Sequence, residues 1–79
     1  MHPYNNLDKI EIGKRVSVID FESLALPAKF YELGFFPGSI IEVKYKAPFN
    51  GPICLKIIEN DTLIAIRKSE ARLIITKEI

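Results

Sequence analysis

Apolar and polar residues alternate along five short stretches of this 79-residue chain. Alternation with a period of two places every second side chain on the same face, which is typical of a β-strand with one buried face. The predicted strands are residues 15–19, 39–46, 53–58, 62–66 and 73–76. In the second of them, the pattern places Ile41, Val43 and Tyr45 together on one face.

The spacing of apolar residues changes to that of a helix just before the second strand. Leu26, Phe30 and Leu33 stand at positions i, i+4 and i+7, which share one face of an α-helix. Gly34 follows directly and predicts the C-terminal cap of that helix. A single further helical turn is predicted at residues 69–71, before the last strand.

Two segments rich in proline and glycine mark reversals of the chain. Pro37 followed by Gly38 suits the middle of a type II turn, because proline sets φ and glycine allows a positive φ. Asn50-Gly51 is a strong reversal signal between two prolines that cannot donate to a strand ladder. The residues predicted to have structural roles in turns are Gly34, Pro37, Gly38, Pro48, Gly51 and Pro52.

Short strands joined by short loops predict a small all-β fold, because such strands must close on themselves to avoid bare edges. We expect an SH3-like, partly open β-barrel of about five strands with one short α-helix. A four- or five-stranded sheet with one helix packed on it is the competing architecture. The polar residues 1–6 predict a flexible N-terminus, and residues 7–79 predict one domain. The predicted core consists of Val16, Val18, Leu26, Phe30, Leu33, Ile41, Val43, Leu55 and Ile57.

Composition narrows the functional classes. A hydrophobic content of 48% argues against a disordered chain, and a single cysteine, Cys54, cannot form an internal disulfide. No apolar run approaches the length of a membrane span, and the N-terminus lacks the regions of a signal peptide, so a cytoplasmic location is expected. The net charge of +1 supplies no general attraction to nucleic acid.

Candidate chemistry is sparse along the chain. The only histidine, His2, and Cys54 have no partners at metal-ligand spacing, so we expect no metal site and no cofactor. The serines have no histidine base available except His2, and the four glycines are too scattered to form a phosphate-binding loop. The sequence therefore predicts a protein that is not an enzyme.

Aromatic residues are the remaining candidates for a functional surface. Phe35 and Phe36 are adjacent, so both cannot easily point into one small core, and one of them is expected to be exposed. Tyr31 lies off the apolar stripe of the predicted helix, and Phe49 lies in the turn between two prolines. Several exposed aromatics in one patch indicate a partner surface. The predicted partner-binding residues are Tyr31, Phe35, Phe36 and Phe49.

The order and spacing of these motifs resemble one known family. Leu33-Gly34-x-x-Pro37-Gly38, a strand, Ala47-Pro48, a turn and Ala65-Ile66-Arg67-x-x-x-Ala71-x-x-Ile74 together resemble ferrous iron transport protein A (FeoA). Leu7-x-x-Ile10-x-x-Gly13-x-x-Val16 is similar to the opening strand region of that family. Two positions depart from the family pattern, because Thr76 replaces an apolar residue and Pro27 replaces a polar or basic one.

The resemblance implies an SH3-like barrel in a small, cytoplasmic, non-enzymatic accessory of bacterial ferrous iron uptake. The partner that it implies is the cytoplasmic part of the membrane transporter FeoB, which would recruit the protein to the inner face of the membrane without insertion. A small nucleic-acid-binding or regulatory barrel is the alternative, and it would need a basic patch with interleaved aromatics. Retention on heparin or single-stranded DNA separates the two hypotheses. The sequence leaves the oligomeric state, including a homo-oligomer, open.

Overall fold

A computed structural model describes residues 3–22 and 28–79 of the chain. Its strands are β1 (Tyr4–Asn6), β2 (Arg15–Phe21), β3 (Ile40–Lys46), β4 (Ile53–Ile57), β5 (Thr62–Ile66) and β6 (Ile74–Glu78). Its helical turns are a 3-10 helix, η1 (Leu7–Lys9), and two short α-helices, α1 (Lys29–Glu32) and α2 (Lys68–Ala71).

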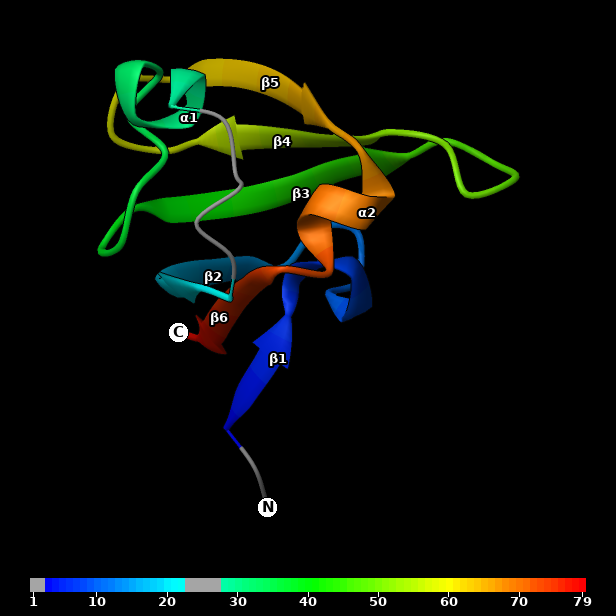
Figure 1. Cartoon of the computed structure of the whole chain (residues 1–79), viewed down its shortest axis with the longest axis horizontal. Helices are drawn as coiled ribbons and strands as arrows, with labels where there is room; N and C mark the ends of the chain where they lie inside the picture. Colours follow the sequence, from blue (N-terminus) through cyan, green and yellow to red (C-terminus); the bar gives the residue numbers. More distant parts are fainter. Residues whose placement is uncertain (1–2, 23–27) are drawn as a thin grey trace.

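The six strands of the described residues form one antiparallel sheet in the order β1-β6-β2-β3-β4-β5. The sheet curls, so that β3, β4 and β5 form one half and β2, β6 and β1 the other, with α2 beside the opening between them (Figure 1). Because β1 and β5 end the strand order without pairing with each other, the barrel is partly open. The predicted small all-β barrel is confirmed, with six strands where the sequence suggests about five.

The core lies between the two halves of the curled sheet. Paired residues of neighbouring strands point into it together, as Val16 does with Ile41 and Val43 with Leu55, and all four are fully buried. Of the nine predicted core residues, seven are buried: Val16, Val18, Phe30, Ile41, Val43, Leu55 and Ile57. Leu26 lies outside the described residues. The period-two pattern therefore identified the sheet's contribution to the core correctly.

Leu33 is the wrong prediction in that set, since 38% of its surface is exposed. The helix ends too early for the i+7 position to reach the core, because α1 stops at Glu32. Gly34 then adopts φ +88°, and its N–H donates to Tyr31 O at 3.1 Å while Phe35 N–H donates to Phe30 O at 2.8 Å. This hydrogen-bond pair is the Schellman motif, which turns Phe35 back onto Phe30, so Phe35 is fully buried in place of Leu33.

The N-terminal strand was also missed. The prediction of a flexible segment over residues 1–6 is wrong for Tyr4–Asn6, which pairs with β6 along the outer edge of that strand (Figure 1). Thr76 of β6 is fully buried, and its hydroxyl donates to the backbone oxygen of Asn5 at 2.8 Å. Leu7, directly after β1, is fully buried in the core. At position 76 the family pattern has an apolar side chain. In this chain, the threonine at that position instead stabilises β1 through its hydrogen bond to Asn5.

Irregular pairing explains why Tyr45 does not share the inward face of Val43. The register between β3 and β4 shifts between Val43 and Tyr45, so Lys44 is an extra residue without a partner. Such a β-bulge changes the face on which the following side chains lie. Tyr45 is consequently 57% exposed.

Replacing Phe35 with alanine tests whether Phe35, rather than Leu33, belongs to the core. Because Phe35 is fully buried and contacts two other aromatic rings, Phe35→Ala should lower the free energy of unfolding by about 3–5 kcal/mol. Leu33→Ala, the matched control at a partly exposed position, should lower it by about 1 kcal/mol or less. Urea unfolding of the three proteins measures both values, and an equal loss for the two variants would contradict this packing.

Gly34 and Gly38 allow a second stability test, because both have positive φ but differ in the space around them. An ideal Cβ on Gly34 would lie 2.7 Å from Nδ2 of Asn60, whereas nothing lies within 4 Å of one on Gly38. Gly38→Ala should therefore cost about 1–2 kcal/mol from backbone conformation alone. Gly34→Ala should cost more, because it also disturbs the hydrogen bond from Asn60 to Leu33 O. Thermal unfolding with Gly34→Ala no less stable than Gly38→Ala would refute this.

Candidate interaction surfaces

The end of α1 and the turn after it expose three apolar side chains. Tyr31 is 53% exposed, Phe36 44% and Leu33 38%, and together we call them the helix-end surface. The expectation that one of the two adjacent phenylalanines points outward is met by Phe36. The prediction of Phe35 as a contact residue is wrong, because its side chain is fully buried and cannot touch a partner.

A partly buried ring and a fully buried one, Phe21 and Phe35, support this surface. The ring of Tyr31 meets Phe21 edge-on at 5.8 Å between centroids, and Phe21 stacks on Phe35 at 6.1 Å. Aromatic pairs in these geometries gain energy beyond the area they bury. The exposed face of Tyr31 is therefore held by a chain of rings that leads into the core, which reduces the ordering cost of binding.

The turn that carries Phe36 is equally well fixed. The hydroxyl of Ser39 is buried, accepts from Phe36 N–H at 3.1 Å and donates to Gly34 O at 2.7 Å. Ser39 N–H donates back to Phe36 O at 2.9 Å across Pro37 and Gly38, and Gly38 has φ +99°. Pro37 and Gly38 thus occupy the two central positions of the turn, with the positive φ that a type II turn requires.

The second predicted surface is the β3–β4 loop, where Phe49 is 99% exposed. The reversal lies one residue earlier than the Asn-Gly signal suggests, because Phe49 and Asn50 carry the positive φ values, 58° and 59°. Gly51 N–H donates to Pro48 O at 3.1 Å and closes the turn. The N–H of Ala47 donates to Pro52 O at 2.9 Å at the base of the turn. A Cβ on Gly51 would lie 2.7 Å from the Cβ of Ala47, so only glycine fits at position 51.

This turn holds Phe49 in an unfavourable conformation. Two positive φ values are typical of a type I′ turn, whose first central position favours asparagine, aspartate or glycine. A bulky residue in the left-handed region is an outlier that points to a function for its side chain. No packing of the Phe49 side chain compensates for this backbone conformation, because the side chain is 99% exposed.

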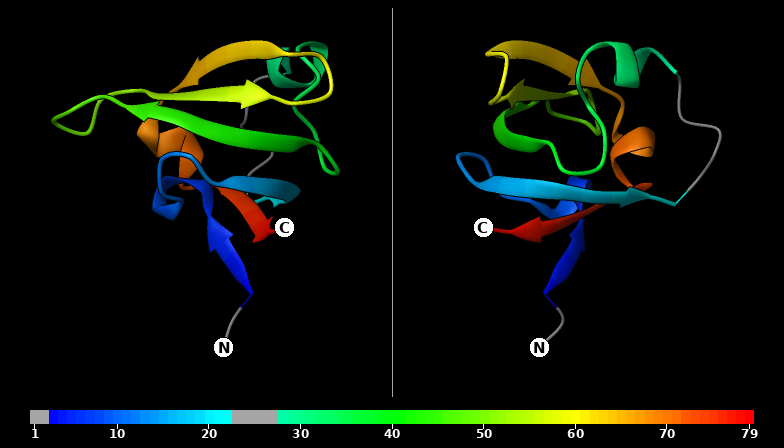
Figure 2. Two further views of the ribbon diagram at one scale, coloured as in Figure 1. Left: turned by 180° about the vertical axis from the view of Figure 1, so that it is seen from behind. Right: turned by 90° about the vertical axis from the view of Figure 1, so that its left-hand side faces the viewer.

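The helix-end surface and Phe49 lie at opposite ends of the β3–β4 hairpin. The turn with Phe36 leads into the start of β3, and the loop with Phe49 leaves its end (Figure 2). Seven strand residues span roughly 20 Å. The predicted partner-binding residues therefore do not form one surface, but two separate ones.

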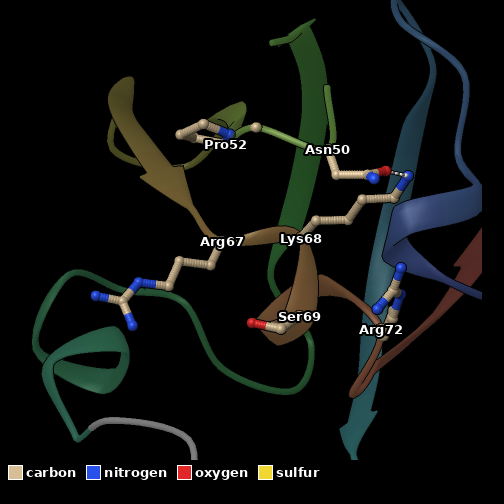
Figure 3. A pocket seen from close by; sticks show the side chains of 7 residues that line it. Asn50, Pro52, Arg67, Lys68, Ser69 and Arg72 are labelled. Carbon is tan, nitrogen blue, oxygen red and sulfur yellow. Dashed lines mark hydrogen bonds between the residues drawn. The ribbon is translucent and has the colours of Figure 1, made fainter. Parts of the chain in front are cut away.

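Sequence reasoning missed a third feature beside α2. A hollow of about 420 Å³ opens between the β3–β4 loop and α2, and we call it the α2 hollow. Its lining residues are Asn50, Gly51, Pro52, Arg67, Lys68, Ser69 and Arg72 (Figure 3). The sequence signal that could have revealed the hollow is the presence of three basic residues within positions 67–72, namely Arg67, Lys68 and Arg72. The apolar pattern of this segment predicts only a helical turn.

Two surface carboxylates have a lowered pKa, and both lie in ion pairs. Hydrogen bonds from Lys44 and then Arg15, at 2.8 Å each, lower the pKa of Glu42 to about 2. The hydrogen bond from Lys56 lowers the pKa of Asp61. These shifts favour the charged carboxylate, whereas a general acid needs a raised pKa. The ion pairs therefore have structural roles and give no indication of catalysis.

The described residues offer no metal-binding constellation. Over residues 3–22 and 28–79, no group of three or more His, Cys, Asp or Glu side chains lies together. Cys54 is half-buried in β4, and His2 lies outside the described residues. The absence of a metal site stays a prediction. In the same part of the chain, no helix has the length and apolar character needed to cross a membrane.

Replacing Phe49 tests whether its turn is strained. Phe49→Asn should raise the free energy of unfolding by about 1 kcal/mol, because asparagine tolerates the left-handed region and no buried contact is lost. A gain of that size raises the melting temperature of a domain this small by about 4–8 °C. Phe36→Asn, at a partly exposed position without positive φ, is the control and should bring no gain. A melting temperature unchanged by Phe49→Asn would show that the turn is not strained.

Comparison with known proteins assigns the chain to one family. The family model described as "FeoA domain" matches residues 5–78, which is nearly the whole chain. A comparison with curated proteins finds no match.

Solved structures of similar proteins share the fold. An FeoA-like protein from Clostridium acetobutylicum is 29% identical with a TM-score of 0.82, and the match covers 100% of this chain and 91% of that one. Iron(II) transport protein A from Clostridium thermocellum is 33% identical with a TM-score of 0.83, over 95% of this chain and 46% of that one. FeoA from Stenotrophomonas maltophilia, complexed with zinc and described as a procaryotic SH3 domain protein, is 25% identical with a TM-score of 0.71, over 90% and 87%. The chain, an SH3-like barrel matched over nearly its full length, belongs to the FeoA domain family.

Proposed function

We propose that this protein is a cytoplasmic accessory of ferrous iron uptake that docks on the cytoplasmic part of a FeoB-type transporter and modulates it by protein–protein contact. Membership of the FeoA domain family, which is associated with ferrous iron transport, supports the general role.

The helix-end surface is the proposed contact with the transporter, and the observation that carries this proposal is the exposure of Tyr31 and Phe36 on a rigid support. Aromatic side chains at the centre of an interface commonly carry a large share of its binding energy. Tyr31 rests on Phe21 and the turn of Phe36 is closed by Ser39, so little conformational freedom is lost on binding. The net charge of +1 fits a contact driven by shape and apolar area rather than by electrostatic steering.

Binding of the full chain to the purified cytoplasmic domain of the transporter tests the proposal. Tyr31→Ala and Phe36→Ala should each weaken the affinity by about 30-fold, which corresponds to the roughly 2 kcal/mol of an interface hot spot. Tyr45→Ala is the matched control, because this tyrosine is 57% exposed on β3 but lies outside the surface. It should bind as the parent does.

Phe49→Ala separates the helix-end surface from the β3–β4 loop at the other end of the hairpin. Loss of affinity with Phe49→Ala alone would move the contact to that loop and contradict the assignment to Tyr31 and Phe36. Parent-like binding by every folded variant would show that neither aromatic surface is the contact. Failure of the parent to bind the transporter domain would refute the function itself.

A further inference from the structure

We infer that the α2 hollow binds an acidic segment of a partner polypeptide. This goes beyond the proposed docking of the helix-end surface, because it concerns another part of the molecule and a different kind of contact. The inference rests on three observations: the positive charge of the hollow, the lack of close ion pairs for its cations among the described residues, and the positions of those cations.

The hollow is far more positive than the chain as a whole. The chain carries eleven basic residues against ten acidic ones, which leaves almost no net charge. Three of those cations, Arg67, Lys68 and Arg72, line the hollow, and no carboxylate does. Glu70 lies in the same helical turn, but its Oε1 accepts from the backbone N–H of Arg67 at 2.9 Å and so caps the helix.

The cations of the hollow are not strongly paired within the described residues. Lys68 Nζ donates at 2.9 Å to the neutral amide oxygen of Asn50 (Figure 3). Arg72 Nε lies 3.9 Å from Oδ2 of Asp8, which is the outer limit of an ion pair. Among the ion pairs of residues 3–22 and 28–79, none includes Arg67 or Lys68. Their charges are therefore available to a negatively charged ligand.

The placement of the cations favours an extended acidic chain over a single small anion. Figure 3 shows Arg67 extending to one side of Ser69, while Lys68 and Arg72 lie on the other side. A peptide with several carboxylates can cross the hollow and meet the cations on both sides in turn. Guanidinium groups suit this ligand because their planar N–H donors match a carboxylate with two hydrogen bonds. A concave site also fits a chain segment better than the broad plane of a membrane.

The test uses the full-length, ¹⁵N-labelled protein and a defined probe. The probe is a blocked eight-residue peptide in which glutamate and serine alternate, and its counterpart has glutamine in place of glutamate. Titration with the glutamate peptide should shift the amide signals of residues 50–51 and 67–72, and the glutamine peptide should leave them unchanged. Because the contact is between charges, the affinity should fall as salt is raised.

Removing the charges tests the assignment to particular residues. The double variant Arg67→Gln/Arg72→Gln should weaken binding of the glutamate peptide by about 10-fold or more, since each charge-assisted hydrogen bond contributes substantially. Lys14→Gln removes an exposed cation outside the hollow and should change the affinity by less than about two-fold. Both arginines are exposed, so the double variant is expected to keep its fold, which its melting curve verifies.

Several results would overturn the inference. Equal binding of the glutamate and glutamine peptides, signal shifts confined to other residues, or an equal effect of Lys14→Gln would each refute it. Tighter binding of inorganic phosphate, of vesicles with phosphatidylserine, or of single-stranded DNA at the same amides would assign the hollow to a different ligand. None of these measurements involves the transporter, so a failure here is distinguishable from a failure of the proposed docking.

Discussion

Every strand of this barrel depends on its pairing register, because one curled sheet supplies both walls of the core. A slip of one residue would move the buried set of a strand to the solvent face. In a chain of 79 residues few other contacts can replace that burial. Val16 opposite Ile41 and Val43 opposite Leu55 are buried pairs that hold β2, β3 and β4 together. The register shift after Val43 comes only once these pairs are complete, so the strand bends without disturbing the core.

The strands could be predicted from the sequence because alternation is a local signal, but the end of α1 could not. An i, i+4, i+7 stripe places Leu33 in the core only if the helix continues that far, and Gly34 reverses the chain first. The position of Phe35 depends on the Schellman hydrogen bonds, which bring it against Phe30. Gly34 was recognised as a cap, but the consequence of capping for its neighbours is a three-dimensional effect.

Two other failures share a cause, since each depends on contacts between distant parts of the chain. The strand β1 is stabilised by Thr76, which is seventy-one positions away from its acceptor, Asn5. The α2 hollow likewise forms only when the β3–β4 loop and α2 meet, so no single stretch of sequence displays it.

The helix-end surface and the α2 hollow lie on different elements, which has a physical consequence for any assembly that uses both. The helix-end surface offers apolar area around Tyr31 and Phe36, a contact that charge screening by salt does not weaken. The α2 hollow offers the charges of Arg67, Lys68 and Arg72, whose attraction extends over about 8 Å at physiological ionic strength. Because the helix-end surface is formed by residues 31–36 and the hollow by the β3–β4 loop and the region of α2, the two share no residue, and binding at one need not obstruct the other. A chain with a net charge of +1 can therefore present one apolar and one cationic contact at the same time. The net charge does not indicate the cationic contact, because acidic residues elsewhere in the chain balance it.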